Sequence, residues 1–314
     1  MGIFRQFPYT NFHELNLDKI LEMVKDSNEK ISKVYDTIYN NLKDIIYQWF
    51  EEHPDLIDYA LIEDSCKTLI NDSLGGISYE IGKTEKDIYT IITIPKDKFK
   101  MTLEPVCEQP TDSAPIRKFV LEKNPNFAMN ISNTGDFIYN GILYGSDYTQ
   151  GLHGSIYALR NDESVDFDIF ENPTMLSEVR DAGYKYAIAS WNALRVGGVN
   201  RNVDYEYSTY KNVNPRQTLA WDDEKWYIYT SYSRLAIYGY ETENLYGLTM
   251  REVRDFCENR GYPNVIALDG GGSIYNATGK PFVELSPNIN NGYWRSAYMC
   301  IAFNERSEND EWNI

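Results

Sequence analysis

Apolar residues repeat with a seven-residue period over the first fifty positions of the chain. Between residues 17 and 49 they recur in alternating steps of four and three, and the series has one polar member, Asn28. This seam predicts a helical coiled coil, and leucine at a positions with isoleucine at d positions favours a homo-oligomer, a trimer or tetramer, over a dimer. A helix folded against its own domain remains a second interpretation, because Ile20, Val34 and Ile46 widen the apolar stripe.

Short apolar runs replace this pattern after Pro54. Residues 55–72 read as a second helix that stops at Gly75 and Gly76, and residues 119–130 as a helix leading into a strand. Further strands are expected at residues 77–81, 88–94, 186–190 and 226–232. The predicted fold class is α+β, a mixed β-sheet domain with helices behind an N-terminal α-helical coiled coil. Its divisions are residues 1–53, a helical linker over 54–74, the domain over 75–304 and a polar tail over 305–314.

One apolar run ends in a carboxylate followed by three glycines. The four residues from Val265 to Leu268 predict a short interior strand, which places Asp269 at the strand end. Glycines tolerate backbone angles that other residues resist, and their successive N–H groups form an anion-binding hollow in some loops. In many other loops the same glycines make a plain turn. Both interpretations are open from this run alone.

The segments before this run predict further elements that fix the position of Asp269. Thr249, with Glu252 three residues later, has the pattern of a capping box and predicts a helix that stops at Gly261. About fifty residues before Asp269, Pro215 and the residues up to 221 predict another strand. Helix, turn and strand therefore deliver the carboxylate to a defined position.

Composition and charge exclude several classes of protein. A chain of 314 residues with 42% hydrophobic and 25% charged residues is typical of one soluble domain with an appendage. No apolar run has the length of a membrane span, and the first residues lack the apolar core of a signal peptide. A net charge of −17 argues against a nucleic-acid partner. The 4 cysteines have no paired spacing and the chain has 3 histidines, so neither a metal nor another cofactor is expected.

Two motifs resemble those of the phosphodiester glycosidase family, whose members include the enzyme that uncovers mannose 6-phosphate. That family has a Pro-Arg-Thr-like strand start, then a helix, then a strand ending in Asp-Gly-Gly-Gly-Ser. The matching positions here are Pro215, Arg216, Gln217 and Thr218, and then Asp269, Gly270, Gly271, Gly272 and Ser273. A closing strand led by Arg295 and a loop at Trp191 and Asn192 are also similar. The resemblance covers about residues 75 to 304.

The resemblance implies a hydrolase that acts on a sugar attached through phosphate. Asp269 is the expected base or nucleophile, and Arg216 and Arg295 are the expected phosphate clamps. A chain of this net charge needs such local positive charge to bind an anionic substrate, and Arg195 is a third source of it. The residues expected to bind substrate are Gly270, Gly271, Gly272, Ser273, Thr218, Asn130, Asn192 and Trp191.

One departure from the family leaves other functions open. The family carries Asn-Gly-Gly-Phe-Phe near the start of its domain, whereas Asn130 here is followed by Ile131 and Ser132. A bulkier loop narrows the sugar pocket, changes the sugar it accepts, or abolishes catalysis. The expected functions are therefore, in order, a glycosidase, a non-catalytic receptor-binding protein that uses the same pocket, and a structural spacer.

A short N-terminal segment resembles the opening of tail and appendage proteins of small podoviruses. It reads Asn-Phe-His-Glu-Leu-Asn-Leu-Asp over residues 11–18, and a plain helix cap at Asn16 also accounts for part of it. The resemblance implies that residues 1–53 attach the chain to other phage tail proteins of the virion, after synthesis in the host cytoplasm. The partner it implies is a host cell-surface glycan, such as a teichoic acid or capsule.

Overall fold

The computed structural model describes residues 76–83, 87–147, 154–161, 164–171, 174–203, 211–231, 248–280, 282–285 and 295–307. The predicted coiled-coil seam, the predicted helix over residues 55–72 and most of the predicted polar tail lie outside these residues. Within these ranges no helix is both long and apolar enough to cross a membrane.

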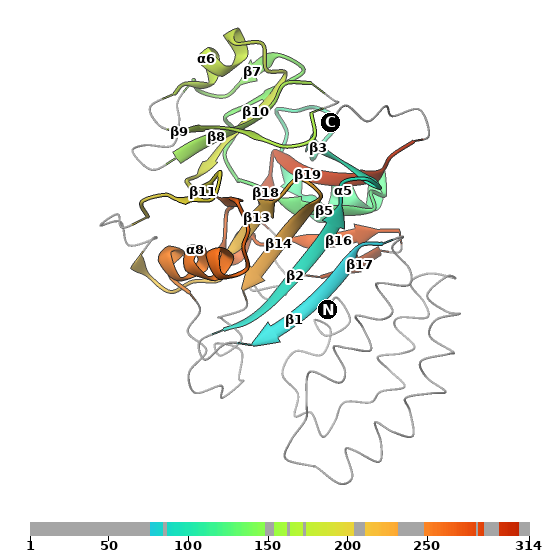
Figure 1. Ribbon diagram of the computed structural model, residues 1–314. Helices are drawn as coiled ribbons and strands as arrows, with labels where there is room; N and C mark the ends of the chain where they lie inside the picture. Colours follow the sequence, from blue (N-terminus) through green and yellow to red (C-terminus); the bar gives the residue numbers. More distant parts are fainter. Residues whose placement is uncertain are drawn as a thin grey trace, which may run out of the picture.

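A seven-stranded sheet forms one layer of the fold (Figure 1). Its order from edge to edge is β1 (Ser78–Lys83), β2 (Ile88–Pro95), β14 (Lys225–Ser231), β13 (Gln217–Trp221), β15 (Asn264–Ala267), β11 (Ala193–Val196) and β12 (Val199–Asn200). The strand that leads to Asp269, β15, therefore lies between two neighbours inside this sheet.

Two five-stranded sheets complete the architecture. The β5 sheet has the order β17 (Phe282–Glu284), β16 (Asn276–Gly279), β5 (Phe127–Asn130), β19 (Met299–Glu305) and β3 (Phe99–Pro105). The β10 sheet has the order β7 (Ile142–Tyr144), β6 (Phe137–Tyr139), β10 (Tyr186–Trp191), β8 (Gly154–Leu159) and β9 (Asp168–Glu171). A separate short pair joins β18 (Ser296–Ala297) to β4 (Ala114–Pro115).

The prediction of an α+β fold with a mixed sheet is wrong. The described residues are mostly β-strand, and every strand pairing among them is antiparallel. Local patterns of apolar residues identify individual strands, but the direction of a neighbouring strand depends on contacts between distant segments.

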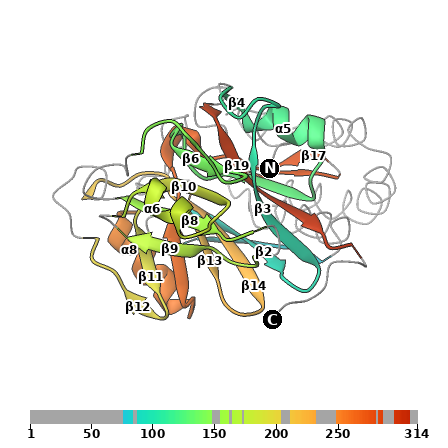
Figure 2. The ribbon, with the colours of Figure 1, turned by 90° about the horizontal axis from the view of Figure 1, so that it is seen from above.

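Each of the three large sheets turns one face to a shared core and the other face to a helix. The shared core takes Ile266 from the seven-stranded sheet, Met129 from the β5 sheet and Ile188 from the β10 sheet. On the outer faces lie α8 (Met250–Asn259), α5 (Ile116–Lys123) and α6 (Leu176–Asp181), respectively. Figures 1 and 2 show α8 and α6 on the outside of their sheets. The three sheets thus enclose one hydrophobic core.

Strand β19 shows how the sequence fits this arrangement. Met299, Ile301 and Phe303 contact the shared core, whereas Cys300 and Ala302 face α5. Large side chains fill the core, and small ones allow the helix to approach the sheet. Because both faces are buried, the strand reads as a continuous apolar run instead of an alternating one.

Several predicted elements are confirmed, and the clearest is α8. The Thr249 hydroxyl accepts the N–H of Glu252 at 3.2 Å, and the Glu252 carboxylate accepts the N–H of Thr249 at 2.8 Å. The helix ends just before Gly261, whose φ is +78°. Strands β1, β2, β10, β14 and β15 also lie where the sequence places strands. The predicted closing strand, by contrast, is broken at Tyr298 into β18 and β19.

We expect Thr249→Ala to lower the free energy of unfolding by about 1 kcal/mol, because the first turn of α8 loses its side-chain acceptor. Thr249→Ser keeps the hydroxyl and is the matched control. Denaturant unfolding of the full chain measures both variants. An alanine variant as stable as the serine variant would show that the cap contributes nothing.

Candidate functional site

The loop that follows β15 is fastened at both ends by Asn130. The Asn130 side chain donates from Nδ2 to the carbonyl of Asp269 at 2.8 Å and accepts the N–H of Tyr275 at its Oδ1, also at 2.8 Å. The N–H of Asp269 in turn donates to the carbonyl of Ile131 at 3.0 Å. Asn130 is 1% exposed. Its structural role is therefore to set the path of residues 269–275, as a positioning residue behind the surface of the site.

Two glycines in this loop are required by its geometry, Gly270 by a close contact with Pro215 and Gly271 by its backbone angle. A Cβ atom at Gly270 would lie 2.6 Å from the Pro215 carbonyl oxygen, and Gly271 has a φ of +59°. The N–H of Gly271 donates to that same carbonyl at 3.0 Å. Gly272 is buried in the 3₁₀ turn Gly271–Ser273. The glycines thus allow the loop to lie against the start of β13.

The predicted hollow of N–H groups is directed at protein atoms. The N–H of Gly270 bonds to the Asp269 carboxylate, that of Gly271 to Pro215, and that of Ser273 to the carbonyl of Gly270 at 3.1 Å. Gly270 and Gly271, two of the three glycines predicted to form the hollow, therefore use their N–H groups within the chain. The loop offers a phosphate few main-chain donors, so side-chain donors are needed to hold one.

The Asp269 carboxyl lies among neutral and cationic donors. It accepts hydrogen bonds from the Ser273 hydroxyl and the Trp191 indole, and Arg295 is close enough to act on its charge. Burial raises the pKa of Asp269 above its ordinary 3.8, although these donors and the Arg295 charge act to lower it. A carboxyl group whose pKa is raised is a stronger base when ionised, which suits acid–base or nucleophilic work.

Ser273 links this carboxyl to two further side chains. Its Oγ accepts Nδ2 of Asn133 at 2.6 Å and Nη1 of Arg295 at 3.3 Å. Arg295 is exposed, so its guanidinium reaches the cluster from the solvent side. Asn133 was not among the predicted site residues, because an isolated asparagine in a loop carries no local signal. We refer to Asp269, Ser273, Arg295, Trp191 and Asn133 as the Asp269 cluster.

Arg216 does not join the Asp269 cluster. It is 3% exposed, and its guanidinium donates to the carbonyls of Leu248 at 3.1 Å and Asn212 at 2.6 Å. These bonds tie the start of β13 to Leu248, just before α8, and to Asn212, a few residues before β13. The described contacts give Arg216 a structural position in place of the predicted phosphate clamp.

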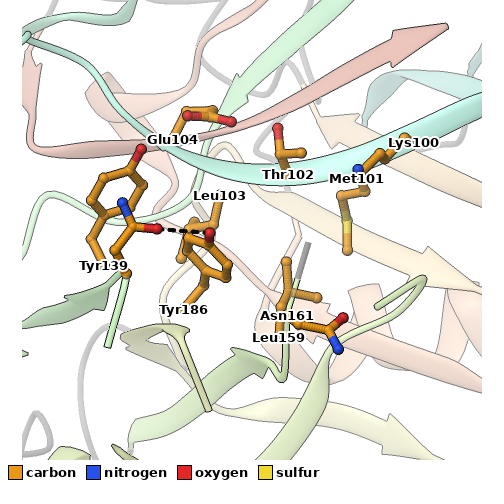
Figure 3. A pocket seen from close by; sticks show the side chains of 10 residues that line it. Lys100, Met101, Thr102, Leu103, Glu104, Tyr139, Leu159, Asn161 and Tyr186 are labelled. Carbon is orange, nitrogen blue, oxygen red and sulfur yellow. Dashed lines mark hydrogen bonds between the residues drawn. The ribbon is translucent and has the colours of Figure 1, made fainter. Parts of the chain in front are cut away.

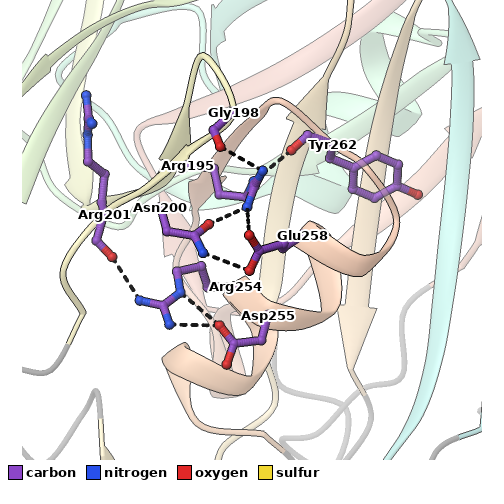
Figure 4. A network of polar contacts seen from close by, with 8 residues as sticks. All are labelled: Arg195, Gly198, Asn200, Arg201, Arg254, Asp255, Glu258 and Tyr262. Atoms are coloured by element: carbon purple, nitrogen blue, oxygen red, sulfur yellow. Dashed lines mark hydrogen bonds and ion pairs between the residues drawn. The ribbon is translucent and has the colours of Figure 1, made fainter.

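Arg195, the third expected source of positive charge, is also held within the fold (Figure 4). It is 7% exposed and donates to the carbonyls of Tyr262 at 3.0 Å and Gly198 at 2.9 Å. It also pairs with Glu258 of α8 at 3.0 Å. Arg195 therefore joins the β11–β12 hairpin to α8, and its charge is neutralised there.

Three other residues, Thr218, Asn192 and Gln217, lie beside the main chain of Ala267 and Leu268. Thr218 is fully buried with its hydroxyl beside the thiol of Cys257 in α8, so it faces away from the shared core. The main-chain carbonyl of Asn192 accepts the N–H of Ala267 at 3.2 Å, and that of Gln217 accepts the N–H of Leu268 at 2.9 Å. The side-chain oxygens of both are buried and accept no hydrogen bond from the described residues. Such atoms are acceptors for a buried water or for a ligand hydroxyl.

The described residues contain no group of three or more His, Cys, Asp or Glu side chains placed to hold a metal ion. Together, the side chains that converge offer one carboxyl, one hydroxyl, one indole N–H and one exposed guanidinium. That set can bind an anionic ester through Arg295 and present a carboxyl to it.

The fold is similar to that of solved structures. For the catalytic domain of zebrafish N-acetylglucosamine-1-phosphodiester alpha-N-acetylglucosaminidase, auto-inhibited by its pro-peptide, the TM-score is 0.53 at 14% identity, covering 73% of this chain and 83% of that chain. For a hypothetical protein from Synechocystis the TM-score is 0.48 at 13% identity, covering 73% of this chain and 62% of that chain. For a putative exported protein from Burkholderia pseudomallei the TM-score is 0.44 at 9% identity, covering 69% of this chain and 74% of that chain. No protein-family model matches the sequence, and neither does any curated protein. The first likeness shows a related fold.

We expect Asp269→Asn to stabilise the protein at neutral pH and to lose that advantage in acid. The folded-state pKa of Asp269 is raised, so ionisation costs free energy as pH rises through that pKa, whereas asparagine carries no charge. Denaturant unfolding between roughly pH 3 and pH 8 measures the effect. The difference in unfolding free energy should grow from near zero in acid and then level off. A difference that favours aspartate at neutral pH contradicts this account.

Arg216→Ala and Arg295→Ala should differ in their effect on stability. Loss of the buried Arg216 guanidinium removes its hydrogen bonds to the carbonyls of Leu248 and Asn212, leaves a buried gap, and should lower the unfolding free energy by about 2–4 kcal/mol. Loss of the exposed Arg295 should change it by less than about 0.5 kcal/mol. Thermal and denaturant unfolding compare the two. Equal losses would contradict the structural position assigned to Arg216.

Proposed function

We propose that this chain is a glycosidase that hydrolyses a sugar-phosphodiester linkage in a host surface glycopolymer, such as a teichoic acid or capsule. The observation that carries the proposal is the convergence of Asp269, Ser273 and Arg295 in one cluster. The related fold of a glycosidase that acts on a phosphodiester supports it. The setting on a phage tail rests on the resemblance of residues 11–18 to tail proteins.

Hydrolysis of a sugar-phosphodiester needs a base or nucleophile and a donor that binds the phosphate, and the Asp269 cluster contains both. A sugar attached through phosphate has a stabilised leaving group, so protonation of the departing oxygen contributes less than in ordinary glycoside cleavage. Asp269 either takes a proton from the water that attacks the anomeric carbon, or attacks that carbon itself to form an ester that water then hydrolyses; in both cases the phosphate group leaves with the bonding electrons. The exposed guanidinium of Arg295 holds the phosphate, and the Ser273 hydroxyl keeps both groups in register.

The position of Trp191 gives the sugar a surface to lie on. Its indole N–H is bonded to the Asp269 carboxylate, so the ring stands beside the reactive group. Ring faces of this kind cover the apolar C–H face of a pyranose. Asn192 and Gln217 supply buried acceptors on the adjoining strands, which suit sugar hydroxyls.

A second candidate is a receptor-binding protein that grips the same glycan without cutting it. The position of Arg216 favours it, because the predicted second phosphate clamp is committed to the carbonyls of Leu248 and Asn212. One arginine can hold a phosphate, but two hold it in a fixed orientation. Loss of orientation reduces catalysis more than binding.

The test is release of phosphate-linked sugar from purified host wall polymer by the full chain. Asp269→Asn should lower the turnover rate by about 100-fold or more. Arg295→Ala should mainly raise KM, because the anionic group loses its donor. Arg201→Ala is the matched control, since Arg201 pairs with Glu171 at the surface and should leave the rate unchanged.

Each outcome distinguishes the candidates. Full turnover by Asp269→Asn would remove Asp269 from the mechanism. Binding of wall polymer by the native chain without any sugar release would decide for the receptor-binding function. Binding that survives Arg295→Ala unchanged would contradict the phosphate role of that residue.

A further inference from the structure

A cavity lies between the edge of the β5 sheet and the β10 sheet (Figure 3). Its volume is about 360 Å³, within the range of small-molecule sites. One wall is the run 100–104 of β3, and the other is built from Tyr139, Asn140, Leu159, Asn161 and Tyr186. Neither wall includes a residue of the Asp269 cluster.

The length of β10 separates the cavity from the Asp269 cluster. Tyr186 begins this strand and lines the cavity, whereas Trp191 ends it and bonds to Asp269. Five residues of strand correspond to about 16 Å. The cavity is therefore a distinct site at the other end of the β10 sheet.

Strand β3 presents main-chain hydrogen-bonding groups to the cavity. The N–H of Val106 donates to the carbonyl of Tyr298 at 2.8 Å, and that of Arg306 to the carbonyl of Lys98 at 2.9 Å. In this antiparallel register the even-numbered residues of β3 therefore form the hydrogen-bonded pairs with β19. The main-chain groups of Met101 and Leu103 point to the opposite edge, where β3 has no neighbouring strand among the described residues.

The facing wall holds two tyrosine rings and an oriented amide. The rings of Tyr139 and Tyr186 lie 5.6 Å apart, edge to face. The Tyr186 hydroxyl donates to Oδ1 of Asn140 at 2.8 Å, which leaves the amide nitrogen as a donor. Asn140 and Gly141 have φ values of +52° and +77°, as a two-residue hairpin turn between β6 and β7 requires. The turn thus fixes the amide in the lining of the cavity.

Charge and polarity point to a neutral ligand. Lys100 and Glu104 stand at the two ends of the β3 wall, and their charges offset each other (Figure 3). Met101, Leu103 and Leu159 are buried apolar residues of the lining, between 2% and 3% exposed. The net charge of −17 disfavours an anion. Aromatic rings, amides and main-chain groups around an apolar base suit a molecule with hydroxyls at its rim and a C–H face, which describes a sugar.

We propose that this cavity binds a neutral pyranose unit of a polysaccharide, separately from the Asp269 cluster. The ring of Tyr186 or Tyr139 covers the C–H face, and Asn140, Asn161 and the edge of β3 meet the hydroxyls. A peptide added as a strand to β3 is the competing occupant. Charged residues on the edge and cover by another sheet are features that oppose such pairing.

The test is saturation-transfer NMR on the full chain with methyl α- and β-pyranosides of glucose, galactose, mannose and N-acetylglucosamine at millimolar concentration. At least one glycoside should bind. Tyr186→Ala and Tyr139→Ala should each weaken that binding about tenfold. Tyr186→Phe keeps the ring but frees Asn140, and should weaken binding less. Ile142→Ala, at a side chain 56% exposed on the neighbouring strand, is the matched control and should change nothing.

Asp269→Asn separates this proposal from the proposed enzyme. Glycoside binding that persists in Asp269→Asn supports the second site whether or not the chain cleaves phosphodiesters. Binding lost in Asp269→Asn but kept in Tyr186→Ala would overturn it, as would the absence of binding by every glycoside. Binding of an extended hexapeptide, with shifts of the Met101 and Leu103 amide signals, would assign the edge to a peptide and also overturn it.

Discussion

The Asn130 side chain is the interaction on which the candidate site depends. Its two hydrogen bonds, one to Asp269 and one to Tyr275, join the end of β5 to both ends of the loop that carries Asp269 and Ser273. A neutral amide is suited to this task because it donates and accepts in one plane, which neither a carboxylate nor a hydroxyl reproduces at both positions. Since the amide is fully buried, each bond replaces a costly unpaired main-chain group.

Burial on both faces of the sheets explains how that loop is held. Strand β15 carries Ile266 into the shared core and Val265 and Ala267 toward α8, so neither face is free to shift. Gly270 then lies against Pro215 at the start of the neighbouring β13. The carboxyl of Asp269 is therefore surrounded by groups that packing holds in place. The stability of the rest of the fold offsets the free energy that ionising this buried carboxyl costs. Arg295 supplies the compensating charge from the surface.

The sequence predicted what depends on neighbours along the chain. The capping pair Thr249 and Glu252 defined α8, and the run before Asp269 defined β15, because both signals are local. Strand direction was mispredicted, because it depends on contacts between segments far apart in the sequence. The burial of Arg216 depends on such contacts too, and no local pattern predicts it. The pair Asn140 and Gly141 is typical of a hairpin turn, but a turn signal does not predict the cavity beside it, because strands far apart in the sequence form its walls. Asn133 carried no pattern that distinguishes it from any loop asparagine.

The central claim is that Asp269 is a buried carboxyl whose acidity is set by its surroundings and by Arg295. A pH titration of its side-chain carboxyl carbon by ¹³C NMR, in the full chain and in Arg295→Ala, tests this most directly. The account predicts a midpoint above the ordinary 3.8 in the native chain and a further rise when the guanidinium is removed. A native midpoint at or below 3.8, or one that Arg295→Ala leaves unchanged, would contradict it.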